Sequence, residues 1–172
     1  MKKSRSAVTM KGEPVTLVGD EPEVGDPAPD FMAVNPDLDT VPFSSLGDGI
    51  FVLSSVVSLD TPVCDTQTKT FNKKATEFGD EVEVITISMD LPFAQERWCG
   101  AAGVDRVRTL SDYRDASFGM AYGMLIKDLR LLARAVFVVN KDHKLCYKQV
   151  VPEVTDAPDY EPVLECLREL TE

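Results

Sequence analysis

The strongly apolar segment at residues 50–57 predicts a strand that is covered on both faces. Runs of this kind are typical of the parallel strands in α/β proteins. Further apolar segments predict strands at residues 31–34, 82–87, 107–110 and 131–139. Together they predict a central sheet that supplies much of the hydrophobic core.

Helical patterns lie between these apolar segments. One helix is predicted to run from Pro62 towards Gly79, which ends it, and a second to start at Pro92 and to be closed by Gly100. A helical turn within residues 112–122 and a final amphipathic helix over residues 158–170 follow. Strands that alternate with helices predict an α/β domain of three layers.

Two hairpins complete the predicted domain. Residues 8–10 and 15–18 form an N-terminal hairpin with Gly12 in its turn, and residues 145–151 pair with the apolar strand before them. The length of 172 residues suits one domain, residues 1–172, of which residues 1–7 are expected to be mobile.

The net charge of −11 narrows the choice of partners. Nucleic acids and anionic membrane surfaces repel an acidic protein, so neither is expected to bind. The basic residues at the N-terminus are followed by no apolar run of signal-peptide length, and no segment reaches transmembrane length. We therefore expect a cytoplasmic protein whose thiols are mostly reduced.

The chain has four cysteines but no CxxC pair, and its one histidine is His143. A zinc site needs a Cys and His spacing that this sequence lacks, so no metal site is expected. A single histidine also makes a Cys–His pair improbable as the route to a reactive thiolate, unless His143 folds back.

Cys64 is the cysteine whose surroundings predict reactivity. It follows the strand at residues 50–57 and lies in the first turn of the helix that Thr61 caps and Pro62 opens. Unpaired backbone N–H groups and the helix dipole favour the thiolate form at that position. The alternative is a small buried side chain without chemistry, which describes most free cysteines.

Two further residues could act on Cys64. Arg134 interrupts an apolar strand, where a guanidinium needs a partner, and it could either hold the Cys64 thiolate or pair with an acid such as Asp60 or Asp90. Thr61, three positions before Cys64, could donate to the thiolate or accept a hydrogen bond from a peroxide, or it could serve only as the helix cap.

The remaining cysteines differ in what their positions suggest. Cys99 lies on the second helix and could trap a sulfenic acid on Cys64 as a disulfide, or it could be buried and inert. Cys146 lies in a strand and Cys166 on the last helix, and both are expected to be structural. Apolar residues near Cys99 and in the 118–125 loop could partly line a mouth beside Cys64: Met89, Leu91, Phe93, Trp98, Met120, Tyr122 and Met124.

Three segments resemble the bacterial thiol peroxidases, the atypical two-cysteine branch of the peroxiredoxins. They are SLDTPVCDT (58–66), DLPFAQERWCG (90–100) and LARAVFVV (132–139), and the similarity extends from about residue 8 to residue 170. The second segment is the most specific. One position departs from the wider family, whose proline four residues before the threonine is Val57 here, so that peroxide positioning is expected to be looser.

The resemblance implies a thioredoxin-like fold with a central mixed β-sheet and an N-terminal β-hairpin, in a homodimer. It implies an enzyme that reduces hydrogen peroxide and organic hydroperoxides for antioxidant defence, without a metal, haem or flavin. Cys64 would be the peroxidatic cysteine and Cys99 the resolving cysteine, with Thr61 and Arg134 as the activating pair. Thioredoxin would be the usual reductant of the disulfide.

Other classes of function remain open on the sequence. A general disulfide oxidoreductase would need a CxxC motif, which Cys64 and Gln67 do not supply. A binding module or redox sensor would leave Cys64 with the reactivity of an ordinary thiol. A purely structural role would bury Cys64 and Arg134 with no opening beside them.

Overall fold

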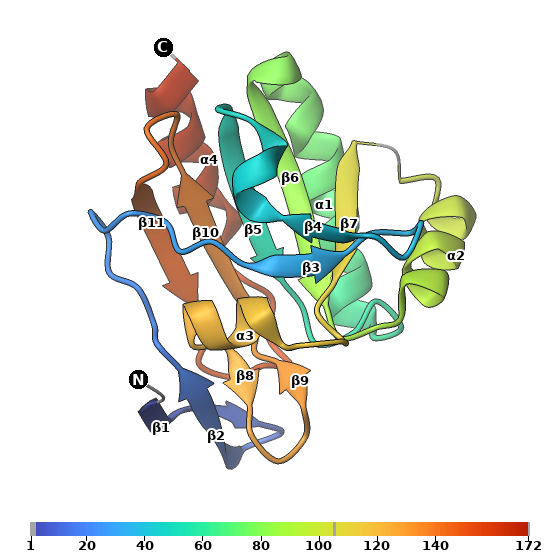
Figure 1. Cartoon of the computed structure of the whole chain (residues 1–172), viewed down its shortest axis with the longest axis vertical. Coiled ribbons are helices and arrows are strands. Elements are labelled where there is room, and N and C mark those ends of the chain that lie inside the picture. Colours follow the sequence, from blue (N-terminus) through green and yellow to red (C-terminus); the bar gives the residue numbers. More distant parts are fainter. Residues whose placement is uncertain (1–2, 105, 172) are drawn as a thin grey trace.

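The computed structural model describes residues 3–104 and 106–171 (Figure 1). The strands are β1 (Lys3–Met10), β2 (Glu13–Gly19), β3 (Met32–Val34), β4 (Thr40–Pro42), β5 (Ile50–Ser55), β6 (Val82–Ser88), β7 (Val107–Ser111), β8 (Leu125–Ile126), β9 (Leu131–Leu132), β10 (Ala135–Val139) and β11 (Leu145–Val150). The helices are η1 (Phe43–Leu46), α1 (Pro62–Ala75), η2 (Thr76–Glu81), α2 (Pro92–Ala102), α3 (Ser117–Tyr122) and α4 (Tyr160–Thr171).

The central sheet has seven strands in the order β11-β10-β5-β6-β7-β3-β4. Strands β5, β6 and β7 are parallel, whereas β10, β11, β3 and β4 run antiparallel to their neighbours. The predicted mixed α/β sheet is therefore confirmed. A smaller sheet, β1-β2-β8-β9, holds the N-terminal hairpin.

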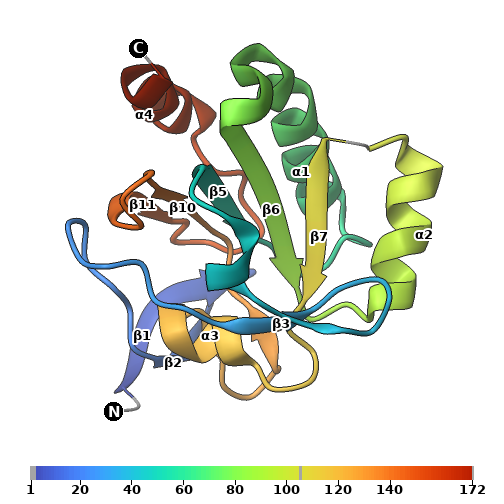
Figure 2. The same ribbon diagram turned by 45° about the horizontal axis from the view of Figure 1, so that its top comes forward.

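The alternation of side chains along β5 divides the core into two layers. Ile50 and Val52 face a cluster that includes Phe71 of α1 and Val163 of α4. Phe51 and the residues on its side face the cluster that α3 and the small sheet supply. Because successive strand residues point to opposite faces, one apolar run fills both layers. Figure 2 shows α1 and α4 on one side of the central sheet, and α3 and the small sheet on the other.

The N-terminal hairpin is longer than predicted. Strand β1 begins at Lys3, and its register pairs Lys3 with Gly19 and Val8 with Val15. Residues 3–7 therefore belong to a paired strand, although their polar sequence suggested a mobile end, and residues 1–2 lie outside the described residues. The turn uses positive φ at both Lys11 and Gly12, as two-residue hairpin turns require.

Two helix ends and one strand also differ from the predictions. Helix α1 ends at Ala75, before the 3-10 helix that contains Gly79, and α2 continues through Gly100 to Ala102. Gly103 ends α2 because its φ of 69° is the left-handed conformation that closes helices. The apolar segment 131–139 is divided into β9 and β10, which belong to different sheets. No helix in the described ranges is long and apolar enough to cross a membrane.

Candidate active site

Cys64 lies in the first turn of α1, close to the carboxyl end of β5. Pro62 occupies the start of the helix, where its missing N–H costs no hydrogen bond. The Cys64 side chain is fully buried within the core cluster on the small-sheet side. The sequence placed this thiol correctly at a helix N-terminus, and the structure adds that other side chains enclose it.

The guanidinium of Arg134 lies against the sulfur. Its Nη1 is 3.1 Å from Cys64 Sγ and donates to Gln67 Oε1 at 2.9 Å, while Nε donates to the Val154 carbonyl at 2.9 Å. Arg134 is 2% exposed. The side chain therefore has the Cys64 contact that one of the two sequence hypotheses required.

The alternative ion pair of Arg134 with Asp60 or Asp90 is not present among the described residues. Asp90 instead accepts hydrogen bonds from Ser58 Oγ at 2.7 Å and from the Leu59 N–H at 2.8 Å. These bonds tie the loop before α1 to the loop before α2. Asp90 is thus a structural tie between two loops and not the counter-ion of Arg134.

Arg134 brings a buried positive charge next to the sulfur of Cys64. Apart from Cys64 Sγ, the groups that accept hydrogen bonds from the guanidinium in this structure are Gln67 and the Val154 carbonyl, and both are neutral. A buried cation without a nearby anion is costly. Cys64 Sγ lies 3.1 Å from Nη1, so the site places a buried positive charge directly against this sulfur.

Gln67 is a site residue that sequence reasoning missed. It is fully buried one turn after Cys64, and its Nε2 donates to Ser54 Oγ of β5 at 2.7 Å. Its amide oxygen is therefore fixed as the acceptor for Arg134. The sequence feature that could have identified Gln67 is its position three residues after Cys64, which places both side chains on the face of α1 that packs on the sheet.

Thr61 does not use its side chain to cap α1, contrary to the prediction. Its hydroxyl donates to the Ser58 carbonyl at 2.8 Å. The single hydroxyl proton is thereby occupied, and the oxygen lone pairs are left to accept. Of the sequence alternatives, this geometry favours a hydrogen bond accepted from a peroxide over one donated to the sulfur.

A cavity of about 450 Å³ opens beside this cluster, with Thr61 and Arg134 in its wall. Its other lining residues are mostly apolar: Met10, Lys11, Val57, Pro62, Val63, Leu131, Val154 and Thr155. The seven residues that the sequence suggested for the mouth are absent from this lining. Tyr122 and Met124 are fully buried in the core, whereas Leu91 and Phe93 are exposed on the α2 side.

Glu153 holds the N-terminal hairpin over this cavity. Its carboxylate accepts hydrogen bonds from Thr9 Oγ1, from the backbone N–H groups of Lys11 and Gly12, and from Thr155. These donors, above all the Thr155 hydroxyl and the Gly12 N–H, hold the pKa of Glu153 well below its usual range. The hairpin turn is therefore fixed as one wall of the cavity.

Cys99 lies on α2, away from the Arg134 cluster. It is half-buried, its sulfur is 4.0 Å from Thr109 Oγ1, and burial raises the pKa of its thiol despite that contact. No contact joins it to Cys64 within residues 3–104 and 106–171, where both are free thiols. Its neighbour Trp98 donates from Nε1 to Asp65 of α1 at 2.8 Å, which links the two helices.

The two cysteines expected to be structural meet each other. Cys146 Sγ of β11 lies 3.9 Å from Cys166 Sγ of α4. No pattern in the sequence predicts that these two positions meet. His143 lies in the turn before β11, with Nε2 3.0 Å from Asp48, so it has no part in the Cys64 cluster.

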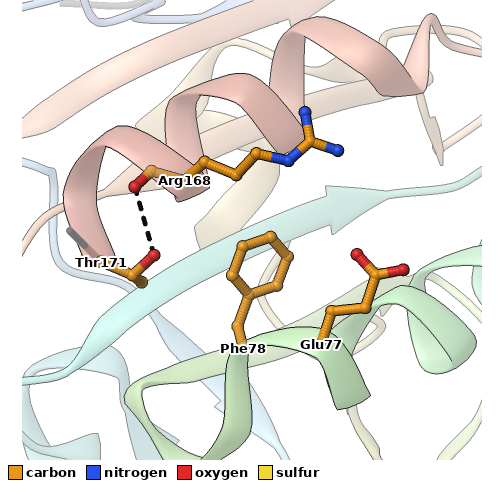
Figure 3. Close-up of a pocket in the computed structure, with 4 residues that line it drawn as sticks. All are labelled: Glu77, Phe78, Arg168 and Thr171. Atoms are coloured by element: carbon orange, nitrogen blue, oxygen red, sulfur yellow. Dashed lines mark hydrogen bonds between the residues drawn. The ribbon is translucent and has the colours of Figure 1, made fainter.

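A second hollow lies between η2 and α4 (Figure 3). Glu77, Phe78, Arg168 and Thr171 line it, and none of them is a thiol or belongs to the Arg134 cluster. It lies near the other end of α1 from Cys64, about 20 Å away at 1.5 Å per helical residue. This hollow is therefore not the redox site.

Comparison with known proteins agrees with the fold. Residues 23–164 match the redoxin family. The chain is 51% identical to the thiol peroxidase of Bacillus subtilis over 95% of its length and 97% of that protein. It is 52% identical to the thiol peroxidase of Oceanobacillus iheyensis, over 94% and 98%. The chain therefore belongs to the redoxin family.

Within that family, these relatives place it among the thiol peroxidases, so the chain is an enzyme, a peroxidase of the peroxiredoxin type. A peroxiredoxin-like protein of Aquifex aeolicus has a similar structure, with a TM-score of 0.88 and 43% identity over 97% of this chain and 98% of that one. A thiol peroxidase of Chromobacterium violaceum has a TM-score of 0.84 at 20% identity, over 94% and 95%, which supports the fold. The expected thioredoxin-like architecture is confirmed.

Proposed function

We propose that this peroxidase reduces hydroperoxides through a sulfenic acid on Cys64 and an intrachain Cys64–Cys99 disulfide, which a dithiol protein such as thioredoxin reduces. The observation that carries the proposal is the 3.1 Å contact of Arg134 Nη1 with Cys64 Sγ, made by an arginine that also lines a cavity. Arginine can stabilise both the attacking thiolate and the negative charge that develops on the peroxide oxygens.

The first step is the oxidation of Cys64. The thiolate attacks one peroxide oxygen, the O–O bond breaks, and the leaving oxygen takes a proton to become alcohol or water. Thr61 accepts a hydrogen bond from the peroxide O–H, because its own proton is held by the Ser58 carbonyl. Arg134, kept in place by Gln67 and the Val154 carbonyl, stabilises the charge.

The second step needs movement of α2. Cys99 must lose its proton and attack the Cys64 sulfenic sulfur, so that water leaves and the disulfide forms. The two sulfurs must approach to about 2 Å, but Cys99 contacts Thr109 and not Cys64. Opening of α2 supplies this approach, and the resulting disulfide then exchanges with the external dithiol.

The cavity supports organic hydroperoxides as substrates in addition to hydrogen peroxide. Its lining includes Met10, Val57, Leu131 and Val154, which offer an apolar surface to an alkyl chain. The homodimer, the cytoplasmic location and the thioredoxin partner are proposed from the family resemblance. The residue roles of Cys64, Cys99, Thr61 and Arg134 are proposed from that resemblance together with the site geometry.

The experiment follows hydroperoxide consumption with thioredoxin, thioredoxin reductase and NADPH. Cys64→Ser is expected to abolish consumption, and Cys99→Ser to allow one oxidation per chain but no turnover through the disulfide. A Cys146→Ser variant serves as the matched thiol control and should keep the activity. Full peroxidase activity in Cys64→Ser would refute the proposal, and full thioredoxin-dependent turnover in Cys99→Ser would refute its second step.

A further inference from the structure

Two thiols outside the proposed mechanism lie in contact. Cys146 Sγ and Cys166 Sγ are 3.9 Å apart, and the two residues are separated by 20 positions in the chain. Helix α4 lies against the β10–β11 side of the central sheet, as Figure 1 shows, and both cysteines pack on the core cluster beneath it. Their proximity is therefore built by the packing of a helix on a strand.

We propose that Cys146 and Cys166 form a second redox-active thiol pair, which closes to an intrachain disulfide between β11 and α4 by exchange with a low-molecular-weight disulfide. Both side chains are half-buried and not enclosed, so a small disulfide can reach them. The sulfurs must move together by only about 2 Å to reach bonding distance. By contrast, Cys64 and Cys99 need the displacement of a helix.

The surroundings distinguish the two sulfurs. A hydrogen bond from the Cys166 thiol lowers the pKa of Cys146, although burial acts against this. The pKa of Cys166 is raised, because it holds the shared proton, because it is partly buried, and because Glu169 lies nearby. Cys146 can also donate to the Val138 carbonyl at 3.4 Å while it is protonated. The proposal therefore assigns the attack to Cys146 and the closing step to Cys166, an order that the matched variants below test.

The exchange balances in two steps. The Cys146 thiolate attacks one sulfur of the small disulfide, forms a mixed disulfide and releases one thiolate. Cys166 then loses its proton and attacks Cys146 Sγ, which closes the protein disulfide and releases the second thiol. The protein loses two hydrogen atoms, and the small disulfide is reduced to two thiols.

The new bond would connect α4 to the sheet behind the helix that carries Cys64. Tyr160 of α4 packs against Phe71 of α1 with ring centroids 5.4 Å apart. A crosslink that closes a loop of this length typically raises the melting temperature of a domain of this size by roughly 5–10 °C. Whether Cys146 and Cys166 are free thiols or a disulfide would therefore affect the stability of α4 and of its packing against α1.

The test uses the full-length Cys64→Ser/Cys99→Ser variant, so that its result is independent of the peroxidase cycle. The reduced protein is incubated with glutathione disulfide and its intact mass and peptides are measured. We expect the loss of two hydrogens, a peptide pair joined through Cys146 and Cys166, and a melting temperature that rises by roughly 5–10 °C and returns with dithiothreitol.

Matched variants assign the two steps. Cys166→Ser in the same background should retain glutathione on Cys146, whereas Cys146→Ser should leave Cys166 largely unmodified. Peptide mapping of the wild-type protein after the same treatment covers the case in which the variants do not fold. Two free thiols after incubation, or two glutathione adducts without a Cys146–Cys166 link, would overturn the proposal.

Discussion

Helices α1 and α2 each follow a parallel strand of the central sheet, and each begins with a proline. Helix α1 buries Cys64, Gln67, Thr68, Phe71 and Ala75, so its inner face is continuous with the core. Helix α2 buries only Pro92 and Gln95, and it leaves apolar side chains exposed at its start.

The difference suits the two thiols to different tasks. Cys64 is held by a helix that is anchored along its length, so the thiolate and Arg134 keep one geometry. Cys99 is carried by a helix with few buried contacts, which can leave the sheet at low cost. The role proposed for Cys64 requires a sulfur with a fixed position, whereas the role proposed for Cys99 requires a sulfur that can move. The predictions below test this contrast.

The largest effect is expected for the fixed partner of Cys64. Arg134→Met removes the charge that balances the thiolate while it keeps an unbranched side chain. We expect the peroxidase kcat/KM to fall by about 100- to 1,000-fold, as for the loss of a charge-stabilising donor in other enzymes. Steady-state hydroperoxide consumption measures this change. A loss of less than about tenfold would contradict the assigned role.

The pH dependence of disulfide formation tests whether Cys99 reacts from the folded or the opened helix. Burial raises the pKa of Cys99 in the folded protein, so its thiolate would become abundant only at high pH. If α2 opens first, the thiol regains the pKa of a free cysteine, and the rate levels off near the pH at which free cysteine ionises, after rising about tenfold per pH unit. Stopped-flow measurement of Cys64 sulfenic acid decay provides the profile, and a rise that continues well beyond this pH would contradict prior opening.

Substitution of Asp90 should destabilise the starts of both helices, because this residue joins the loops that precede them. Asp90→Asn leaves one acceptor oxygen for Ser58, the Leu59 N–H and Ser88, so we expect a loss of about 2 kcal/mol in the free energy of unfolding. Denaturant titration measures this change. Asp60→Asn, at an exposed position in the same loop, is the matched control and should have almost no effect. Equal losses in the two variants would contradict the role of Asp90 as a tie.

A smaller change is expected at the link between the helices. Trp98→Phe keeps the ring but removes the hydrogen bond to Asp65, so α2 should open more easily. A bond worth about 1 kcal/mol predicts disulfide formation that is about fivefold faster. Asp65→Asn keeps an acceptor oxygen and should change the rate less. An unchanged or slower rate in Trp98→Phe would show that this bond does not restrain α2.

The smallest effect concerns the cavity wall. Val57 lines the cavity, and its N–H makes no hydrogen bond within the described part of the chain, so Val57→Pro loses none. We expect stability to stay within about 1 kcal/mol and the preference between hydrogen peroxide and a bulky organic hydroperoxide to shift by less than about threefold. Steady-state kinetics with both substrates measures the shift. A collapse of activity with both would contradict a role limited to the wall.

Local patterns in the sequence were sufficient to predict the start of α1 and the position of Cys64. The apolar run before Pro62 and the proline itself are both local signals. Arg134 could be suspected because a charge inside an apolar segment needs a partner. The two-sheet division around Arg134 could not be predicted, because it depends on pairing of β9 with β8 and of β10 with β5.

Other parts of the site depend on contacts between distant positions. A glutamine such as Gln67 is usually a surface residue, and only the packing of α1 on β5 shows that it is buried. Thr9 and Glu153 are 144 positions apart, and no periodicity predicts their hydrogen bond. The approach of Cys146 to Cys166 depends in the same way on the rotation of α4 about its axis.

The hairpin held by Glu153 contributes to the shape of the cavity but not to the Cys64–Arg134 pair, so the two could evolve independently. Met10 and Lys11 contribute to the cavity wall but have no contact with Cys64 or Arg134 among the described hydrogen bonds. Changes of sequence or length in this turn can therefore alter which peroxides enter while the reactive pair stays intact. In terms of protein engineering, the hairpin is a module that could be replaced to change the substrate range, because Cys64 and Arg134 belong to other elements.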